Sequence, residues 1–408
     1  MIDKPLRGAP SGGPAGSRLG PLGVYVHFPW CLKKCPYCDF LSVAAERKEI
    51  PSRAYADAVI AELERRAPEI GPRTIASVFF GGGTPSLWKP TELGRVLAAI
   101  LAHFARAGEL EVTVECNPSS FDRELAEKLI EVGVNRVSIG VQGLEQGRLE
   151  FLGRLHDRDT ALAAVRDALA AKVPQVSADL IFGVTTLSPE QAVSEALTVA
   201  ELGLTHLSAY ALTIEPGTQF GALAKRGKLP LLDEGRVAES FLALDAALSA
   251  RGFEHYEISN YAREGHVARH NLGYWQGRDY LGLGTGAWGT VSLPDGRLRY
   301  RNTLSPERYL GTDWKNAALF SANGVESAVE PIDRQTELKE RILLGLRLGE
   351  GVDLDQAGRE TGVEPWTRER ERTAQRLVAR GRLQREGGRV WIPKEAWLFA
   401  DGTIAELM

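Results

Sequence analysis

The strongest constraint on the fold is a repeated alternation of short β-branched runs with longer segments whose apolar residues recur at helical spacing. Two of the longer segments are residues 52–67, which begin at Ser52, and residues 188–203, which run from Ser188 to Gly203. Serine favours helix starts and glycine favours helix ends, so both segments predict helices. The strand candidates are residues 23–28, 77–83, 111–117, 136–142, 177–184 and 207–213.

Strand-then-helix units in succession predict a parallel sheet with right-handed crossovers, and therefore an α/β fold. The repetition favours a partial (β/α)6 barrel over a flat doubly wound sheet, although spacing alone leaves both open. In either architecture ligands bind at the carboxyl ends of the parallel strands. We therefore expect functional residues directly after these strands.

The alternation stops near Pro230, and a chain of 408 residues is long enough for more than one domain. The first segment is rich in Gly, Pro and Ser, has no periodicity and predicts a disordered arm. The expected division is 1–20 as this arm, 21–230 as the barrel, 231–330 as an extension of Gly- and aromatic-rich connections, and 331–408 as a C-terminal helical module.

The C-terminal module has a winged-helix-like pattern, since residues 367–393 indicate a helix, a turn and a short hairpin. DNA binding is one use of such a module. Acids and bases are interleaved along it, however, and the whole chain has a net charge of -4. We therefore expect no nucleic-acid partner and interpret the module as a packing cover over the barrel.

Composition and cysteine use predict a cytoplasmic protein. Apolar residues make up 44% and charged residues 25% of the chain, which is typical of soluble globular proteins. No apolar run approaches the roughly 18 residues of a membrane-spanning helix, and the N-terminus has no secretory signal pattern. Three of the four cysteines are clustered and Cys116 is distant, which excludes an extracellular disulfide framework.

The clustered cysteines Cys31, Cys35 and Cys38 form a C-x3-C-x2-C motif directly after the first strand candidate. Thiolates at this spacing can each bind one corner of a [4Fe-4S] cluster and leave the fourth iron without a protein ligand. The alternative is a structural zinc ion with His27 as its fourth ligand. Closed zinc sites favour two separated knuckles, and no second knuckle exists here, so the pattern favours the cluster.

Glycine and polar residues recur at the ends of the later strand candidates. They are Gly81–Thr84 after the second strand, Glu115 at the end of the third, Gln142 at the end of the fourth and Asp179 in the fifth. Glycines let a backbone approach a ligand closely, and Arg154, just beyond the fourth strand, can pair with a carboxylate. Any single one of these polar residues can also be a helix cap or a surface charge. Their recurrence at successive strand ends favours a binding site.

With Tyr37 immediately before its last cysteine, the C-x3-C-x2-C motif resembles the radical S-adenosylmethionine superfamily, in which the open iron binds S-adenosylmethionine. Over about residues 22–408 the chain also resembles the oxygen-independent coproporphyrinogen III oxidase-like family. The matching motifs are "FPWCLKKCPYCDF", "FFGGGTPS", "ECNP", "RVSIGVQ", "LGRLH", "TIEPGT", "HYEISNYA", "RHNLGYW" and "YLGLG".

The resemblance implies roles for individual positions. Tyr37 matches an aromatic position near S-adenosylmethionine, and no catalytic residue is assigned. The positions that match contacts to S-adenosylmethionine are Tyr25, Gly82, Gly83, Thr84, Glu115, Gln142, Arg154 and Asp179.

Two branches of this family differ in features that the sequence contains. The oxidases resemble C-x3-C-x2-C-x-C, with a longer N-terminal segment, whereas this chain has Phe40 at the last cysteine position. The segment "HNLGYW", His270–Trp275, matches a motif of the HemW-type heme chaperones and implies His270 as an axial heme ligand. The alternative for His270 is a histidine that is hydrogen-bonded in a packed loop. We therefore expect a heme chaperone, with oxygen-independent coproporphyrinogen III oxidase as the alternative function.

The expected cofactors are a [4Fe-4S] cluster, S-adenosylmethionine and heme. The expected partners are heme-accepting proteins, among them membrane respiratory enzymes, and a homodimer stays open. The chain departs from the family at Val184–Thr186, where Pro-Gly is common, and at Trp288, where a histidine is common. The second change removes a polar contact near the cofactor, so the details of that loop need not follow the family.

Overall fold

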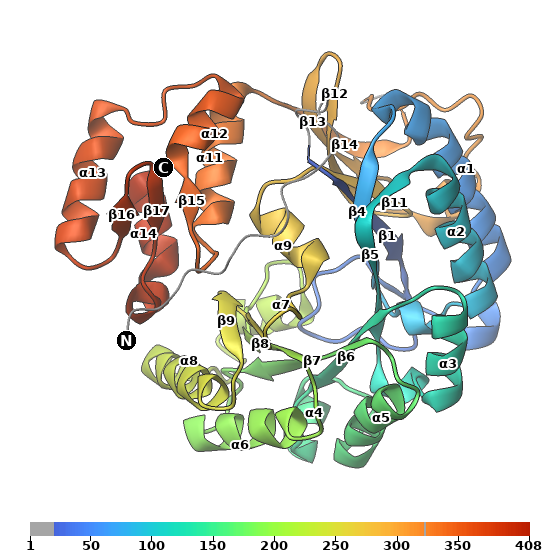
Figure 1. Ribbon diagram of the computed structural model, residues 1–408. Helices are drawn as coiled ribbons and strands as arrows, with labels where there is room; N and C mark the ends of the chain where they lie inside the picture. Colours follow the sequence, from blue (N-terminus) through green and yellow to red (C-terminus); the bar gives the residue numbers. More distant parts are fainter. Residues whose placement is uncertain (1–19, 322–323) are drawn as a thin grey trace.

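The computed structural model describes residues 20–321 and 324–408, so the predicted arm at 1–20 lies outside the described residues except for Gly20. The fold is built on one sheet of 12 strands that curls into a ring, with helices on its outer side (Figure 1). The strand order is β14-β13-β12-β11-β1-β4-β5-β6-β7-β8-β10-β9. None of the helices in the two described ranges has the length and apolar character that a bilayer crossing requires.

All six predicted strands form, and neighbours among them pair in parallel. A further strand, β11, pairs in parallel with the other side of β1. This arrangement confirms the predicted α/β fold and its partial barrel. The parallel strands are β1 (Leu22–Phe28), β4 (Thr74–Gly82), β5 (Ala105–Cys116), β6 (Arg136–Gln142), β7 (Gln175–Phe182), β8 (His206–Ala211) and β11 (Tyr280–Leu283).

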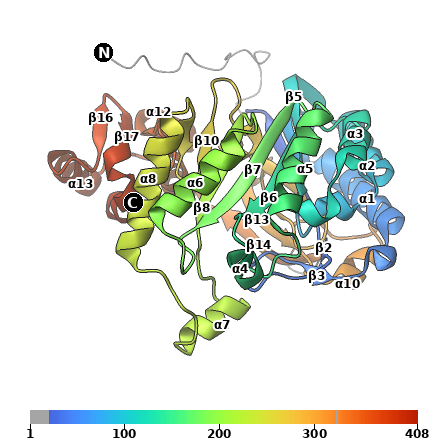
Figure 2. The ribbon, with the colours of Figure 1, turned by 90° about the horizontal axis from the view of Figure 1, so that it is seen from below.

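Helices cover the outer face of these strands, as a view from below shows (Figure 2). The Ser188 side chain caps α6 and forms a capping box with Gln191, as the serine signal predicts. Ser52 is instead the first residue of α1, after Pro51. The outer helices are α1 (Ser52–Ile70), α2 (Pro90–His103), α3 (Arg123–Glu131), α5 (Arg158–Ala170), α6 (Pro189–Ala200) and α8 (Glu234–Ser249), and shorter ones are α4 (Gln146–Phe151), α7 (Gln219–Lys225), α9 (Arg269–Trp275) and α10 (Pro306–Leu310).

Along the parallel strands, apolar side chains point outward to the helices and polar side chains point into the ring. On β1, Val24 and Val26 are fully buried in the apolar core. Tyr25 and His27, which alternate with them, line an internal cavity. Strands β5 to β8 repeat this division, so the inside of the ring is a polar chamber and the core lies outside it.

Antiparallel strands that the sequence analysis did not identify extend both ends of the sheet. They lie in residues 231–332, and some of them are too short for a period of two to be recognisable: β9 has 4 residues and β10 has 3. Their bounds are β9 (Glu254–Glu257), β10 (Asn260–Ala262), β12 (Trp288–Leu293), β13 (Gly296–Asn302) and β14 (Glu326–Ile332).

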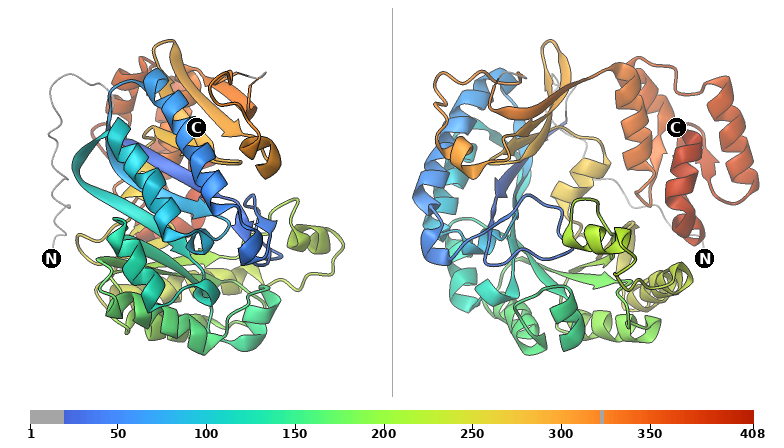
Figure 3. Two further views of the ribbon diagram at one scale, coloured as in Figure 1. Left: turned by 90° about the vertical axis from the view of Figure 1, so that its right-hand side faces the viewer. Right: turned by 180° about the vertical axis from the view of Figure 1, so that it is seen from behind.

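The C-terminal residues form a winged-helix-like unit with an apolar core of their own. Its sheet has the order β15-β17-β16, and the unit lies beside the ring, next to its open side (Figures 1 and 3). The division of the chain at residues 230 and 330 stays a prediction. The elements are α11 (Arg334–Gly345), β15 (Val352–Asp353), α12 (Leu354–Thr361), α13 (Arg368–Ala379), β16 (Gln384–Glu386), β17 (Arg389–Trp391) and α14 (Ala400–Leu407).

Helix α11 and the turn after it contact both ends of the curled sheet. On one end, the β13 arginines Arg297 and Arg299 form ion pairs with Glu337 and Glu340 of α11 at 3.2 and 2.5 Å. On the other end, a β-bridge joins Glu257 of β9 to Leu348. The C-terminal unit therefore connects the two sheet ends and does not lie over the strand ends.

A buried charge cluster ties α1 to the extension of the sheet. Arg66 Nε donates to Glu62 Oε1 at 2.7 Å, and Arg66 Nη2 donates to Glu326 Oε1 and Asn302 Oδ1 at 2.9 Å each. The side chains of Arg66, Glu62 and Glu326 are fully buried. One buried cation thus balances carboxylates from two distant parts of the chain.

Replacing Arg66 tests this cluster. Arg66→Met should lower the free energy of unfolding by about 3–5 kcal/mol, because two buried carboxylates lose their cation. Arg65→Met is the matched control, since Arg65 forms only an exposed pair with Glu69 and should contribute at most about 0.5 kcal/mol. Urea unfolding followed by circular dichroism measures both variants, and equal stability of Arg66→Met and wild type would contradict the assigned role.

Candidate functional site

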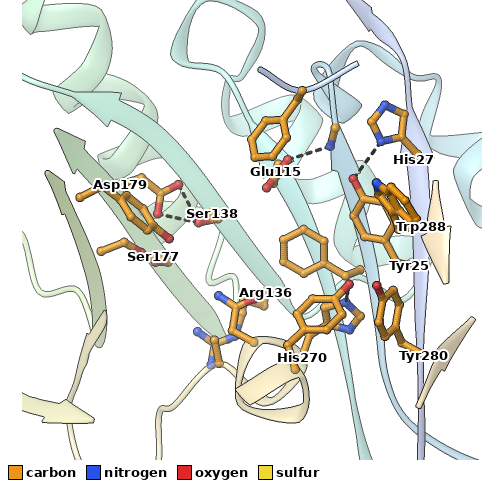
Figure 4. A pocket seen from close by; sticks show the side chains of 18 of the residues that line it. Tyr25, His27, Glu115, Arg136, Ser138, Ser177, Asp179, His270, Tyr280 and Trp288 are labelled. Atoms are coloured by element: carbon orange, nitrogen blue, oxygen red, sulfur yellow. Dashed lines mark hydrogen bonds between the residues drawn. The ribbon is translucent and has the colours of Figure 1, made fainter. Parts of the chain in front are cut away.

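An internal cavity of about 450 Å³ opens at the carboxyl ends of the parallel strands (Figure 4). Helix α9 supplies its floor, and its mouth is formed by the loop after β1 and the turn between β11 and β12. The inward side chains of the parallel strands form its wall. These wall residues are Tyr25, His27, Phe79, Gly82, Glu115, Arg136, Ser138, Ser177, Asp179, His206, Ser208 and Tyr210.

Two carboxylates face the cavity from β5 and β7. Glu115 accepts a hydrogen bond from the Gly82 backbone N–H at 3.0 Å, and Asp179 accepts from Ser138 Oγ at 2.9 Å. Burial, with a smaller contribution from the charge of Asp179, raises the pKa of Glu115 to about 7. Burial also raises the pKa of Asp179. Neither carboxylate has an ion-pair partner in the described parts of the chain, so this wall favours a cationic ligand.

His27 lies in the same wall and is engaged at both ring nitrogens. Its Nδ1 lies 2.9 Å from Tyr25 Oη, and its Nε2 lies 2.8 Å from the Leu41 carbonyl oxygen. Burial lowers the pKa of His27 to about 4, so the imidazole is neutral near pH 7. With both nitrogens occupied, His27 is poorly placed to be the fourth ligand that the zinc alternative requires.

The three clustered cysteines lie in the loop after β1. Cys31 ends β2 (Trp30–Cys31), which pairs with β3 (Val43–Ala44) and so closes the loop that contains Cys35 and Cys38. All three thiols are free and half-buried. Thr84 Oγ1 donates to Cys31 Sγ at 3.3 Å, and Arg154 Nη1 donates to Cys35 Sγ at 3.5 Å.

These thiols suit a cluster better than a single ion. Within residues 20–321 and 324–408, no three His, Cys, Asp or Glu side chains converge to hold one metal ion. Mononuclear zinc requires such convergence, whereas in a four-iron cluster each thiolate binds its own iron. Three free thiols, with a hydroxyl and a guanidinium donating to two of the sulfurs, are a donor set that fits a [4Fe-4S] cluster.

Most of the other sequence-predicted residues lie in two groups, which Tyr37, Gly83 and Gln142 do not join. Tyr25, Gly82, Glu115 and Asp179 line the cavity, together with His270, whereas Thr84 and Arg154 lie beside the cysteine sulfurs. Tyr37 packs on Phe220 of α7, with ring centroids 6.4 Å apart, and Gln142 ends β6 with a φ of 65°. The structure therefore does not bring Tyr37 and Gln142 to the cavity wall.

The glycines after β4 are required by close packing. Gly82 has a φ of 111°, and a Cβ there would lie 2.5 Å from the His27 ring. A Cβ on Gly83 would lie 2.7 Å from the Trp30 carbonyl oxygen. The sequence predicts these glycines to let the backbone approach a ligand. In the structure they let β4 pack closely against β1 and the start of the cysteine loop.

His270 lies in α9, buried beneath the cavity. Its Nδ1 lies 2.8 Å from Ser77 Oγ, its Nε2 lies 2.9 Å from Tyr274 Oη, and its ring stacks on Phe79 at 4.9 Å. Burial lowers the pKa of His270 to about 3. This is the geometry of a hydrogen-bonded, packed histidine, and heme ligation by His270 stays a prediction.

A carboxylate outside the predicted set positions α9. The backbone N–H groups of Arg269 and His270 donate to Glu111 at 3.0 and 2.9 Å, and Arg136 Nε donates to the same carboxylate at 3.0 Å. Glu111 thus fixes the helix that carries the "HNLGYW" motif. The alternation along β5 would have placed Glu111 on the same face as Glu115.

Sequence reasoning missed two classes of cavity residue. Wall residues such as Ser138 and Ser177 lie on strands that were predicted, and the period of two contains the signal for them. The mouth residues Phe40, Trp288 and Arg301 come from a loop and from antiparallel strands. No pattern in the sequence gives the pairing of those strands.

The raised pKa of Glu115 predicts a dependence of stability on pH. Below pH 4.5 the Glu115 carboxyl is protonated in both the folded and the unfolded protein. As pH rises from 4.5 to about 7, the carboxyl ionises in the unfolded protein before it does in the folded protein, so the wild type loses stability. Glu115→Gln stays neutral, so it should gain stability relative to wild type between these pH values and keep that gain above them. Thermal unfolding from pH 5 to 8 measures this, with Glu254→Gln as an exposed control on β9. Parallel curves for Glu115→Gln and wild type would refute the raised pKa.

Comparisons with known proteins agree with this geometry. The Radical SAM superfamily model matches residues 25–196, and the HemN C-terminal domain model matches residues 332–399. The solved structure described as "Coproporphyrinogen III oxidase (HemN) from Escherichia coli is a Radical SAM enzyme" superposes with a TM-score of 0.78, covering 96% of this chain and 91% of that chain. At 19% sequence identity, that likeness shows the fold alone.

Several curated relatives are similar along most of their length. A protein of Mycobacterium tuberculosis (strain ATCC 25618 / H37Rv) named heme chaperone HemW is 34% identical over 389 residues, which cover 95% of each chain. The protein of that name in Escherichia coli (strain K12) is 36% identical over 318 residues, 78% of this chain and 82% of the relative. A Mus musculus protein, "Radical S-adenosyl methionine domain-containing protein 1, mitochondrial", is 34% identical over 81% of this chain and 74% of its own. The chain therefore belongs to the radical S-adenosylmethionine superfamily and, within it, to the HemW family.

Proposed function

We propose that the protein is a heme chaperone that holds a [4Fe-4S] cluster, binds S-adenosylmethionine and heme, and transfers heme to acceptor proteins. The observation that carries this proposal is the 34% identity to a HemW heme chaperone over 95% of both chains. That likeness includes the barrel, the antiparallel extension and the C-terminal unit. The acceptors, expected among membrane respiratory enzymes, and a homodimer remain predictions.

Cys31, Cys35 and Cys38 are the proposed cluster ligands. Burial raises the pKa of Cys38 to about 11 and raises that of Cys31 as well, so both thiols need a bound metal to become thiolates near neutral pH. The hydrogen bonds that Thr84 and Arg154 donate would then fall on thiolate sulfurs and stabilise their charge. When bound, the cluster would supply an open iron and a single electron.

The cavity supports S-adenosylmethionine as a ligand through its charge. That molecule carries an ammonium and a sulfonium, and Glu115 and Asp179 offer two carboxylates without ion-pair partners. Arg154, which donates to Cys35 Sγ and to the Gly140 carbonyl oxygen, has a buried Nε without a partner. The proposed contacts are Tyr25, Gly82, Gly83, Thr84, Glu115, Gln142, Arg154 and Asp179, with Tyr37 nearby.

One preparation tests the function. Anaerobically reconstituted protein, with S-adenosylmethionine and a reductant, should retain heme and leave coproporphyrinogen III unconsumed. Cys35→Ser should hold far less iron than wild type, because one cluster ligand is lost. Stable heme binding is measured by the Soret band after gel filtration, and substrate by porphyrin chromatography. Formation of protoporphyrinogen would favour the oxidase instead, and full iron and sulfide in Cys35→Ser would overturn the ligand assignment.

His270 is the proposed axial heme ligand, and the structure sharpens its test. Coordination through Nε2 requires Tyr274 to release its hydrogen bond to the ring. Tyr274→Phe should therefore tighten heme binding several-fold, because Nε2 no longer has a competing partner, and His270→Ala should weaken binding and shift the Soret band. Unchanged heme titrations in both variants would reassign the ligand to another group.

A further inference from the structure

One side of the cavity mouth is formed by Trp288 and Arg301, which are directly paired on β12 and β13. The Arg301 guanidinium lies over the Trp288 indole, with 5.2 Å between Cζ and the ring centroid. Trp288 remains 38% exposed and lines the cavity together with Tyr25 and His27, all three of which are labelled in Figure 4. Trp288, one of the two places where this chain departs from the pattern of the family that it resembles, is therefore part of the cavity mouth.

Arg301 differs from the other arginines on its strand. Arg297, Arg299 and Arg301 are every second residue of β13 and therefore lie on the same face of the strand. Arg297 and Arg299 each form ion pairs with two carboxylates. In the parts of the chain that the structure describes, Arg301 has no ion pair, and its Nε, like that of Arg297, is buried without a hydrogen-bond partner. The Nε–H of Arg301 is thus a hydrogen-bond donor without an acceptor. Arg301 lines the cavity, so a ligand there could supply the acceptor.

Further exposed aromatic side chains line the same cavity. Phe40, two positions after the last cysteine, is 58% exposed, and Tyr210, at the end of β8, is 39% exposed. Both line the cavity together with Trp288. Large apolar groups that line one cavity are typical of a ligand site, and here the cavity also contains the unpaired cation of Arg301.

The two ends of the cavity therefore prefer opposite charges. Glu115 and Asp179 favour a cation deeper in the wall, whereas Arg301 favours an anion at the mouth. A ligand at the mouth should carry a carboxylate next to a broad, flat apolar surface. A heme has both, because its propionates project from the edge of a planar macrocycle.

We propose that the cavity mouth binds one edge of heme, with a propionate on Arg301 and the macrocycle against Trp288 and Phe40. This proposal rests on the proposed heme-chaperone function and adds a site to it. The guanidinium would donate charge-assisted hydrogen bonds to the propionate, and the aromatic rings would stack on the macrocycle. The site concerns the propionate edge and is independent of which group ligates the iron.

The test compares heme with its dimethyl ester, in which both propionates are masked. Arg301→Gln should weaken heme binding about tenfold or more, as expected for the loss of a charge-assisted hydrogen bond. The same variant should bind the ester as well as wild type does. Arg299→Gln is the matched control on the same face of β13 and should bind heme like wild type. Arg301→Lys keeps the positive charge and should recover part of the affinity.

A second measurement locates the macrocycle. Trp288 is the tryptophan at the cavity mouth. Heme should therefore quench the tryptophan emission of Trp288→Phe less than it quenches that of wild type. S-adenosylmethionine should leave the tryptophan emission unchanged. Iron content and thermal unfolding of each variant confirm that the fold and the cluster site are intact.

The outcomes separate this proposal from the proposed function. Equal affinity of Arg301→Gln and wild type for heme would overturn the mouth site and leave the chaperone proposal standing. Failure of wild-type protein to bind any heme would overturn the proposed function itself. If Arg301→Gln loses affinity for S-adenosylmethionine and not for heme, the guanidinium serves the carboxylate of that cofactor, and the heme assignment is wrong.

Discussion

The alternation of side chains along the parallel strands is the constraint on which the rest of the structure depends. Because successive residues point to opposite faces, Val114 and Cys116 hold β5 to the outer helices while Glu115 between them faces the cavity. A shift of one residue in the pairing would exchange the two sets and place carboxylates in the apolar core. The same pattern that stabilises the sheet therefore also decides which groups can meet a ligand.

The sequence predicts the parallel part of the fold well, because long β-branched runs and capped helices repeat there. It also places Glu115 and Asp179 at one edge, since parallel strands end on the same side of a sheet. It could not place Trp288 and Arg301 together, because that contact depends on antiparallel pairing between strands with weak patterns. Nor could it reveal that Ser77 occupies Nδ1 of His270, because Ser77 lies on a strand that is distant in sequence, whereas the Nε2 partner Tyr274 follows four residues later in the same helix.

Several buried polar groups around the cavity and the cysteine loop have no hydrogen-bond partner in the described residues. Arg136 has a buried Nη1, and Arg154 and Arg301 each have a buried Nε, without a hydrogen-bond partner in the described residues. Buried charges elsewhere are paired but not completely: Arg66 donates to Glu62, Glu326 and Asn302, whereas its Nη1 has no hydrogen-bond partner in the described residues. Buried donors are normally satisfied, and Arg136 and Arg301 line the cavity, where a bound ligand would supply an acceptor.

The contact of α11 with both sheet ends has a mechanical consequence. Around most of the ring, backbone ladders fix the distance between neighbouring strands, but Arg297 and Arg299 hold the remaining gap through side chains that can reorient. The contact between β13 and α11 is therefore the flexible part of the ring. A ligand wider than the cavity would be accommodated by a change in this contact. The position of the C-terminal unit would then depend on whether a ligand occupies the cavity.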